Sequence, residues 1–307
     1  MIMVTATVPL IERGFDALLP ASVATAHRLN DSDVEDILPL EQAIVAGAVQ
    51  TRRDEFRTGR HCAREALSRL GIPRAPILAG PHQEPLWPPA IVGSITHCDG
   101  FRAAAVARQS EICGLGIDVE THGPLPPGVL CEVALPDEQS EVCDLLQRLP
   151  MIRWDRMLFS MKESVYKAWF PLHRRWLSFT DCRVRIDPRR ETFSAKVLAK
   201  SAPAWPLYVH GAWEVDDRFI RTAAWVPAEC TDLSACLPQR RNEAGTDGAL
   251  QLRPLVVGSH EIANHSASHP PASHQIVGPW GGHDPDGDQL ETQRYDRPAA
   301  EHPPRQI

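Results

Sequence analysis

The sequence of 307 residues lacks any apolar run long enough to cross a membrane. Residues 1–10 also lack the basic start and the small-residue cleavage site of a secretory signal, so we expect a cytoplasmic protein without a membrane span. There is no excess of basic residues either: the formal net charge is −7, which argues against a general nucleic-acid-binding protein.

The cysteines lack the spacing of a metal site. No Cys-x-x-Cys pair occurs and none of the eight recurs at zinc-finger spacing, which argues against a structural zinc site. We expect buried, reduced thiols, in keeping with a reducing compartment. The eight are Cys62, Cys98, Cys113, Cys131, Cys143, Cys182, Cys230 and Cys236.

The last part of the chain is poor in periodic apolar residues. From residue 229 onward Pro, Gly, Ser, His and Asp dominate, and 6 Lys and Arg stand against 11 Asp and Glu, a net charge of −5. Such a segment buries too little apolar surface to offset the entropy of ordering. We predict a disordered tail over residues 229–307. Its spaced histidines have no defined ligand geometry, so a solvated linker is favoured over a metal site.

The remainder has the periodicity of an α+β protein. Helical patterns over residues 40–50 and 54–70 precede strand patterns over 91–95 and 101–107. A strand within 111–120 leads to helical patterns over 136–149 and 151–169, and strand-like alternation follows over 178–225. Helices followed by strands thus occur twice, which predicts two similar α/β halves, residues 1–112 and 113–228, forming a pseudo-dimer.

Two carboxylates stand two residues apart in a strand pattern. Asp118 and Glu120 follow Gly116, and side chains two apart in a strand share a face. Carboxylates so close repel each other unless a proton or cation lies between them, and Mg²⁺ favours such oxygen ligands. By itself the pattern favours an exposed strand face with two solvated acids, because Asp-x-Glu is common by chance.

A second constellation lies in the helical pattern of residues 151–169. Glu163 and Lys167 are four residues apart and therefore share a helix face. This spacing fits a third metal carboxylate beside a lysine for a phosphate. It also fits a surface ion pair worth under about 0.5 kcal/mol.

Two further stretches suit phosphate binding. His97 follows Ser94 and Thr96 at a predicted strand end, where a histidine can donate to a phosphate oxygen. Residues 52–64 hold five arginines at a predicted helix start, and guanidinium groups match phosphate oxygens. A structural histidine and a solvated basic helix face are the alternatives.

Together these stretches resemble the phosphopantetheinyl transferase family. Its motifs Gly-x-Asp-x-Glu and Phe-Ser-x-Lys-Glu-Ser-x-Tyr-Lys stand complete at residues 116–120 and 159–167, and residues 59–67 and 94–100 match its supporting stretches. The chain looks like the larger, pseudo-dimeric members, which include enterobactin synthase-like enzymes and the actinobacterial enzymes that serve polyketide, nonribosomal peptide and fatty acid synthesis. The resemblance covers about residues 35–228.

The resemblance implies an enzyme that moves the phosphopantetheine arm of coenzyme A onto a serine of apo acyl or peptidyl carrier proteins, releasing adenosine 3',5'-bisphosphate. Asp118, Glu120 and Glu163 would hold Mg²⁺. Glu163 would take the proton of the serine, and Lys167 would stabilise the leaving group. We expect a monomer whose partners are coenzyme A and the carrier protein.

The resemblance also assigns the coenzyme A contacts. Arg53, Arg60 and His97 would bind the 3'-phosphate end, with Thr96 beside them. Lys162 and Lys167 would bind the pyrophosphate, which Asp118 would reach through the metal. Residues 76–82 would line the adenine pocket, and His82 stands where some relatives have a lysine. Residues 171–177 form a candidate rim for the carrier protein or an ordinary helix-ending loop.

Two other functions remain open on the sequence alone. The same carboxylates would serve a different metal-dependent phosphotransferase or phosphodiesterase, but the arginine cluster and His97 would then be coincidental. The second possible function is that of a protein that binds coenzyme A or a carrier without catalysing a reaction. It would tolerate loss of Glu163 or Lys167, and both residues are present.

Overall fold

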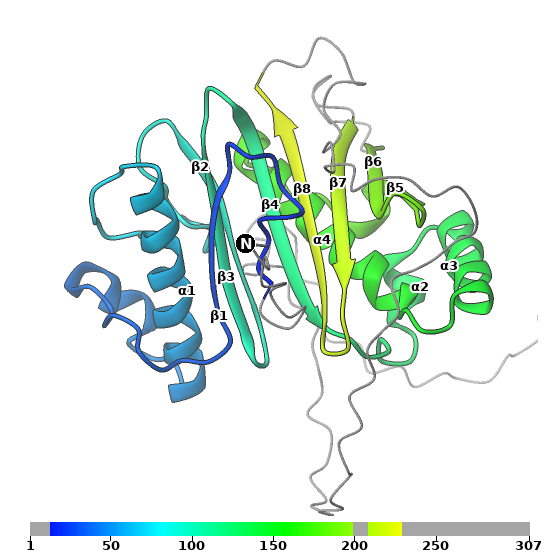
Figure 1. Cartoon of the computed structure of the whole chain (residues 1–307), viewed down its shortest axis with the longest axis horizontal. Coiled ribbons are helices and arrows are strands. Elements are labelled where there is room, and N and C mark those ends of the chain that lie inside the picture. Colours follow the sequence, from blue (N-terminus) through cyan, green and yellow to red (C-terminus); the bar gives the residue numbers. More distant parts are fainter. Residues whose placement is uncertain (1–12, 199–207, 229–307) are drawn as a thin grey trace, which may run out of the picture.

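The computed structural model describes residues 13–198 and 208–228, and within them the chain forms two antiparallel sheets with helices (Figure 1). The smaller sheet has the order β1-β3-β2, from β1 (Ala24–Arg28), β3 (Phe101–Arg108) and β2 (Ile91–Cys98). The larger has the order β4-β8-β7-β6-β5. Its strands are β4 (Ile112–Thr121), β8 (Phe219–Pro227), β7 (Tyr208–Val215), β6 (Thr192–Val197) and β5 (Cys182–Asp187). The α+β class predicted from the sequence is confirmed.

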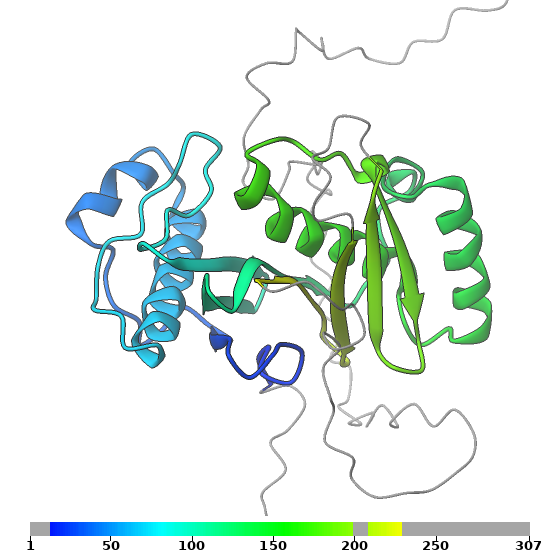
Figure 2. The ribbon, with the colours of Figure 1, turned by 90° about the horizontal axis from the view of Figure 1, so that it is seen from above.

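The helices pack against these sheets. α1 (Gln50–Arg69) lies on the smaller sheet, and α4 (Trp154–His173) lies along β4 and β8 of the larger one (Figures 1 and 2). The others are η2 (Pro39–Val45), α2 (Val129–Val133), α3 (Pro136–Arg148) and η3 (Phe179–Asp181). The helix expected over residues 40–50 is the short 3₁₀ helix η2, and α1 begins four residues before the expected start at residue 54.

Side-chain hydroxyls join the two sheets. Ser94 Oγ accepts the backbone N–H of Ile117 at 3.1 Å, and Thr96 Oγ1 accepts the N–H of Val119 at 3.1 Å. The hydroxyls of β2 thus satisfy β4 amides that would otherwise be buried without a partner. This contact sets the stretch around His97 beside the strand that carries the paired carboxylates.

Close packing of α4 on β4 depends on a glycine. A Cβ atom at Gly116 would lie 1.9 Å from the carbonyl oxygen of Ser164 and 2.7 Å from the amide nitrogen of Ala168. Without that atom the helix backbone rests directly on the strand. Buried tryptophans, among them Trp154, Trp169 and Trp213, fill the core between α4 and the larger sheet.

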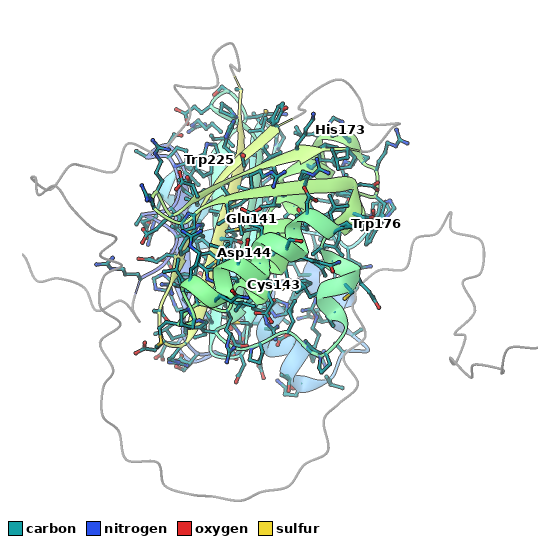
Figure 3. All side chains as sticks on the ribbon, turned by 90° about the vertical axis from the view of Figure 1, so that its right-hand side faces the viewer. Glu141, Cys143, Asp144, His173, Trp176 and Trp225 are labelled. Carbon is teal, nitrogen blue, oxygen red and sulfur yellow. The ribbon has the colours of Figure 1, made fainter. Side chains whose placement is uncertain are left out.

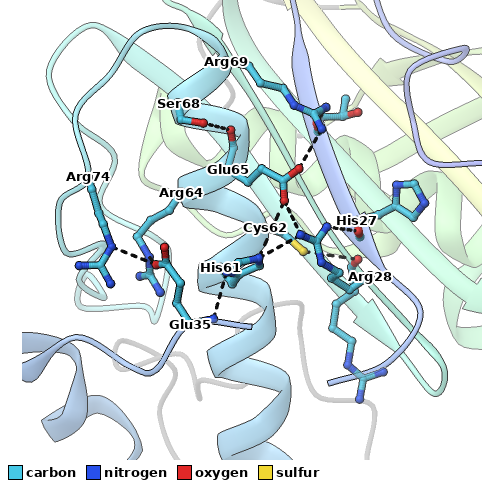
Figure 4. Close-up of polar contacts among 12 residues, drawn as sticks. His27, Arg28, Glu35, His61, Cys62, Arg64, Glu65, Ser68, Arg69 and Arg74 are labelled. Atoms are coloured by element: carbon cyan, nitrogen blue, oxygen red, sulfur yellow. Dashed lines mark hydrogen bonds and ion pairs between the residues drawn. The ribbon is translucent and has the colours of Figure 1, made fainter. Parts of the chain in front are cut away.

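An ion-pair network surrounds α1 (Figure 4). Arg64 Nε lies 3.1 Å from Glu35, and its NH1 lies 3.0 Å from the fully buried Glu41. Arg28 binds Glu65 of α1 at 2.6 Å. Part of the arginine cluster therefore stabilises the fold, because Arg64 is committed to two carboxylates, of which Glu41 is buried and Glu35 is exposed.

Two predictions on organisation are not decided by the structure. The boundary between halves at residues 112 and 113 stays a prediction, and the predicted tail at residues 229–307 lies outside the described residues. In the parts described, every helix is too short or too polar to traverse a bilayer.

Candidate active site

Asp118 is the centre of the site. It lies on β4 with only 4% of its surface exposed. Its Oδ1 accepts from Lys167 Nζ at 2.7 Å and from Thr96 Oγ1 at 3.3 Å, and its Oδ2 accepts from Ser160 Oγ at 2.7 Å. Three elements, β2, β4 and α4, therefore meet at this carboxylate.

Glu120 lies on the same face of β4, as the strand alternation predicts. Its Oε2 accepts from Arg156 NH1 at 2.8 Å. Burial, and then the charge of Asp118, raise the pKa of Glu120 to about 7, although Arg156 acts in the opposite direction. A second negative charge here is therefore costly without an added cation.

Glu163 and Lys167 lie on the face of α4 turned toward β4. Burial raises the pKa of the Glu163 carboxyl to about 8; the Lys167 charge opposes this shift, while the Asp118 and Glu120 charges add to it. Lys167 Nζ also donates to the carbonyl oxygen of Ile117 at 3.2 Å. The Lys167 ammonium at Asp118 and the Arg156 guanidinium at Glu120 supply positive charge among the three carboxylates.

This donor set suits a hard cation by its chemistry. Three carboxylates supply oxygen ligands. Burial and the neighbouring carboxylate charges raise the pKa values of Glu120 and Glu163, so a bound cation would stabilise the ionised form of both side chains. Among residues 13–198 and 208–228, however, no three His, Cys, Asp or Glu side chains are arranged to hold a metal ion as they stand. The Mg²⁺ site predicted at Asp118, Glu120 and Glu163 therefore stays a prediction.

A basic cleft of about 80 Å³ lies between α1 and β2. Arg52, Arg60 and His97 line it together with Ala79 and Gln83. Arg52 NH1 lies 2.7 Å from His97 Nε2, so the two side chains point at the same space. Of the predicted 3'-phosphate residues, the structure brings Arg60 and His97 together.

Arg53 is not among the residues that line this cleft, whereas its neighbour Arg52 is. The helix phase explains the difference. Positions 52, 56 and 60 of α1 recur every four residues and share one face, from which Arg53 is turned by about 100°. The run of arginines in the sequence includes Arg52, but only the phase of the helix decides that Arg52, and not Arg53, lines the cleft.

The positive charge of the cleft comes from its two arginines against one carboxylate, because Glu55 also lines it, 3.4 Å from Arg52 and 3.5 Å from His97. Desolvation, followed by repulsion from Arg52 and Lys167, lowers the pKa of His97 and favours the neutral ring, although 36% of the side chain is exposed. A neutral imidazole still presents one N–H donor. Arg60 holds its place by donating from Nε to the carbonyl oxygen of Ile77 at 2.9 Å and by covering the Phe56 ring.

Two predicted coenzyme A contacts have structural partners instead. The Thr96 hydroxyl is occupied by Val119 and Asp118. Lys162 Nζ donates to Glu138 Oε2 at 2.6 Å and to the carbonyl oxygens of Val133, Phe179 and Cys182, and the residue is 2% exposed. The coenzyme A contacts predicted for Thr96 and Lys162 stay predictions, and the contacts proposed below do without them, although Lys162 also lines the cavity beside Glu163.

A second cavity, of about 190 Å³, opens beside Glu163. Tyr166, Trp176 and Phe179 form the aromatic part of its wall, and the charged residues Glu132, Lys162 and Glu163 line it as well. Trp176 is 50% exposed and packs on Tyr166, with ring centroids 5.2 Å apart. Figure 3 shows Trp176 and His173 on one face of the molecule, close to the end of α4.

His82 lies at the edge of the site. Its ring packs edge-on against Phe170 of α4, with centroids 5.3 Å apart. The residue belongs to a loop that reaches α4 from the segment between α1 and β2.

Two residues of the site were not singled out from the sequence. Ser160 donates to Asp118 and Arg156 donates to Glu120, and of the two only Ser160 is part of the second motif.

Comparison with known proteins agrees with this geometry. The model of the "4'-phosphopantetheinyl transferase N-terminal domain" matches residues 40–107, and that of the "4'-phosphopantetheinyl transferase superfamily" matches residues 114–224. These two ranges contain the cleft arginines, His97 and all the motif residues of β4 and α4.

The chain is also similar to curated relatives over most of their length. It is 44% identical over 236 residues to 4'-phosphopantetheinyl transferase Svp of Streptomyces mobaraensis, covering 76% of this chain and 94% of the relative. It is 41% identical over 221 residues to PptT of Mycobacterium tuberculosis, covering 67% and 95%. Enterobactin synthase component D of Salmonella typhimurium is more distant, at 34% over 127 residues, 39% of this chain and 50% of that protein. With both family models matched, and with Svp and PptT covered over 94% and 95% of their lengths, the chain belongs to the 4'-phosphopantetheinyl transferase superfamily.

Proposed function

We propose that this protein transfers the 4'-phosphopantetheine arm of coenzyme A to a serine of apo acyl or peptidyl carrier proteins and releases adenosine 3',5'-bisphosphate. One observation carries the proposal. The carboxylates of β4 and the Glu163–Lys167 pair of α4 meet at one place, beside a basic cleft formed by Arg52, Arg60 and His97. A pyrophosphate substrate with a further phosphate needs both features.

Asp118, Glu120 and Glu163 are the residues that we expect to hold Mg²⁺. When bound, the ion would neutralise charge on the pyrophosphate oxygens. The raised pKa values of Glu120 and Glu163, about 7 and about 8, support the assignment, because a cation relieves the repulsion that causes part of each shift.

Glu163 is suited to accept the proton of the attacking serine. A general base must come within hydrogen-bond reach of the proton that it takes, and Glu163 lines the cavity proposed below for the pantetheine arm. Lys167, four residues further along α4, would present its ammonium to the phosphate oxygens of the leaving group. Asp118 and the carbonyl oxygen of Ile117 orient that ammonium at 2.7 and 3.2 Å.

The two cavities suit the two ends of coenzyme A. Arg52, Arg60 and His97 would bind the 3'-phosphate, and the loop around Ala79 and His82 would flank the adenine. The aromatic cavity beside Glu163 suits the uncharged pantetheine arm. The exposed Trp176 belongs to the rim that we expect the carrier protein to contact. We also infer a cytoplasmic, monomeric enzyme.

Incubation with coenzyme A, Mg²⁺ and a panel of apo carrier proteins tests the proposal by mass spectrometry. The expected result is a gain of one phosphopantetheine group on the carrier serine, abolished by EDTA and restored by Mg²⁺. Binding of coenzyme A without any mass gain would support the idle binding protein instead. Cleavage of the pyrophosphate without transfer would support a different phosphotransferase or phosphodiesterase.

A further inference from the structure

A small hairpin loop over residues 78–86 reaches from the α1 side of the molecule to α4. Ala79 and Pro85 form an isolated antiparallel bridge, and the N–H of Leu86 donates to the carbonyl oxygen of Leu78 at 2.8 Å. The inner edge of the loop, at Ala79 and Gln83, lines the basic cleft. The position of this loop therefore determines the shape of the cleft.

The loop folds around the carboxylate of Glu84. This residue is only 3% exposed, and its Oε2 accepts the backbone N–H of His82 at 2.9 Å. A Cβ atom at Gly80 would lie 2.2 Å from Glu84 Oε1, so the glycine leaves room for the carboxylate. A buried carboxylate needs a cationic or hydrogen-bonding partner, because desolvation of the charge is otherwise costly.

That partner comes from α4. Arg174, the C-terminal cap residue of α4, forms an ion pair through NH1 with Glu84 Oε1. The backbone of Arg174 has φ 52°, a left-handed conformation that turns the chain at the helix end. Next to the ion pair, the His82 ring packs on Phe170 of the same helix. The loop is thus fastened to the helix that carries Glu163 and Lys167.

We propose that Glu84 and Arg174 are a positioning pair that holds the 78–86 loop against α4, so that the coenzyme A cleft stays aligned with the carboxylates of the active site. The inference rests on the proposed placement of coenzyme A in that cleft. The Arg174 side chain is 58% exposed, so its loss would loosen the loop without opening the core. Neither residue of the pair lines the basic cleft or the cavity beside Glu163.

Steady-state kinetics of Arg174→Gln test the pair. We expect KM for coenzyme A to rise about three- to tenfold, as for loss of one partly buried charged contact, while kcat stays within about twofold of wild type. Arg174→Lys should restore most of the affinity. Glu84→Gln should raise KM for coenzyme A similarly, and the double variant should be no worse than either single one, because both remove the same contact.

Arg148→Gln is the matched control, because Arg148 is also an exposed arginine in the last turn of a helix, α3, and should leave KM for coenzyme A unchanged. An unchanged KM for coenzyme A in Arg174→Gln would overturn the pair, as would a rise in KM for the carrier alone, which would make Arg174 a docking residue. Arg52→Gln separates the two levels of inference. If Arg52→Gln also leaves coenzyme A binding unchanged, the cleft is not the coenzyme A site. If Arg52→Gln weakens binding and Arg174→Gln does not, the cleft is assigned correctly and only the proposed positioning pair is wrong.

Discussion

Lys167 Nζ lies 2.7 Å from Asp118 Oδ1, and both residues are at least 95% buried. This contact joins α4 to β4 at the centre of the site. It pairs one of three neighbouring carboxylates, while the pKa values of Glu120 and Glu163 stay raised at about 7 and about 8. The three acids therefore have different surroundings before any substrate binds, and their variants should differ in stability as well as in activity.

Asp118→Asn should lower both stability and transfer. The change leaves the Lys167 ammonium buried without its carboxylate, which costs on the order of 3–5 kcal/mol. We expect a thermal midpoint lower by several degrees and a transfer rate reduced about a hundredfold or more in the folded protein, because metal affinity also falls. Calorimetry and carrier modification measured on one sample check both effects.

Asp144→Asn is the matched control. Asp144 lies on the exposed surface of α3 (Figure 3), away from the three carboxylates, and its variant should keep the wild-type midpoint and rate. Equal effects of the two substitutions would remove Asp118 from the site.

Glu163→Gln should abolish transfer without destabilising the metal-free protein. Burial raises the pKa of Glu163 from 4.5 to about 8, so between these values the folded protein binds a proton that the unfolded chain has released. Stability of the wild type should therefore fall as the pH rises from about 5 to 8, and the glutamine should reduce that slope. Urea titrations at several pH values measure it. A steeper slope in the variant would contradict the assignment.

Arg52→Gln should weaken coenzyme A binding about tenfold or more, as expected for loss of a charged hydrogen bond worth about 1.5–3 kcal/mol. The effect should be much smaller for the analogue that lacks the 3'-phosphate. Isothermal titration with both ligands separates the contributions. Arg53→Gln is the control in the same helix turn, and an equal loss for both arginines would show a general field effect instead of a cleft contact.

The sequence was sufficient for the parts of the site that depend on local periodicity. Alternation along a strand places Asp118 and Glu120 on one face, and the four-residue spacing places Glu163 and Lys167 on one face of α4. Both patterns act within one element, so no tertiary information was required.

The remainder depends on contacts between distant segments. The Thr96 hydroxyl is used by β4, and Lys162 meets Glu138 from α3, 24 residues earlier. Arg53 and Arg52 are adjacent in sequence, and only the rotation of α1 against β2 decides which faces the cleft. Such choices follow from packing, which periodicity alone does not specify.

Lys162→Met should destabilise the protein instead of weakening coenzyme A binding selectively. The Lys162 and Glu138 side chains are each 1% exposed, so removal of one charge leaves the other buried, at a cost of about 3–5 kcal/mol. Chemical denaturation should show the loss, while KM for coenzyme A of the folded fraction stays near wild type. The exposed Lys196 provides the control, since Lys196→Met should cost little. A normal stability with a raised KM for coenzyme A would return Lys162 to the substrate site.

Gly116→Ala tests whether the site depends on close contact between α4 and β4. A Cβ atom at Gly116 would collide with backbone atoms of Ser164 and Ala168, which cannot rotate away as a side chain would, so the helix must move off the strand. Overpacking costs about 1–3 kcal/mol, and here the same shift also separates Lys167 from Asp118. We expect a lower thermal midpoint together with a loss of transfer larger than the unfolded fraction explains. Gly123→Ala should be nearly neutral, because a Cβ atom there meets nothing within 4 Å. If Gly116→Ala lost stability but kept full activity in the folded protein, the distance between α4 and β4 would not control the chemistry.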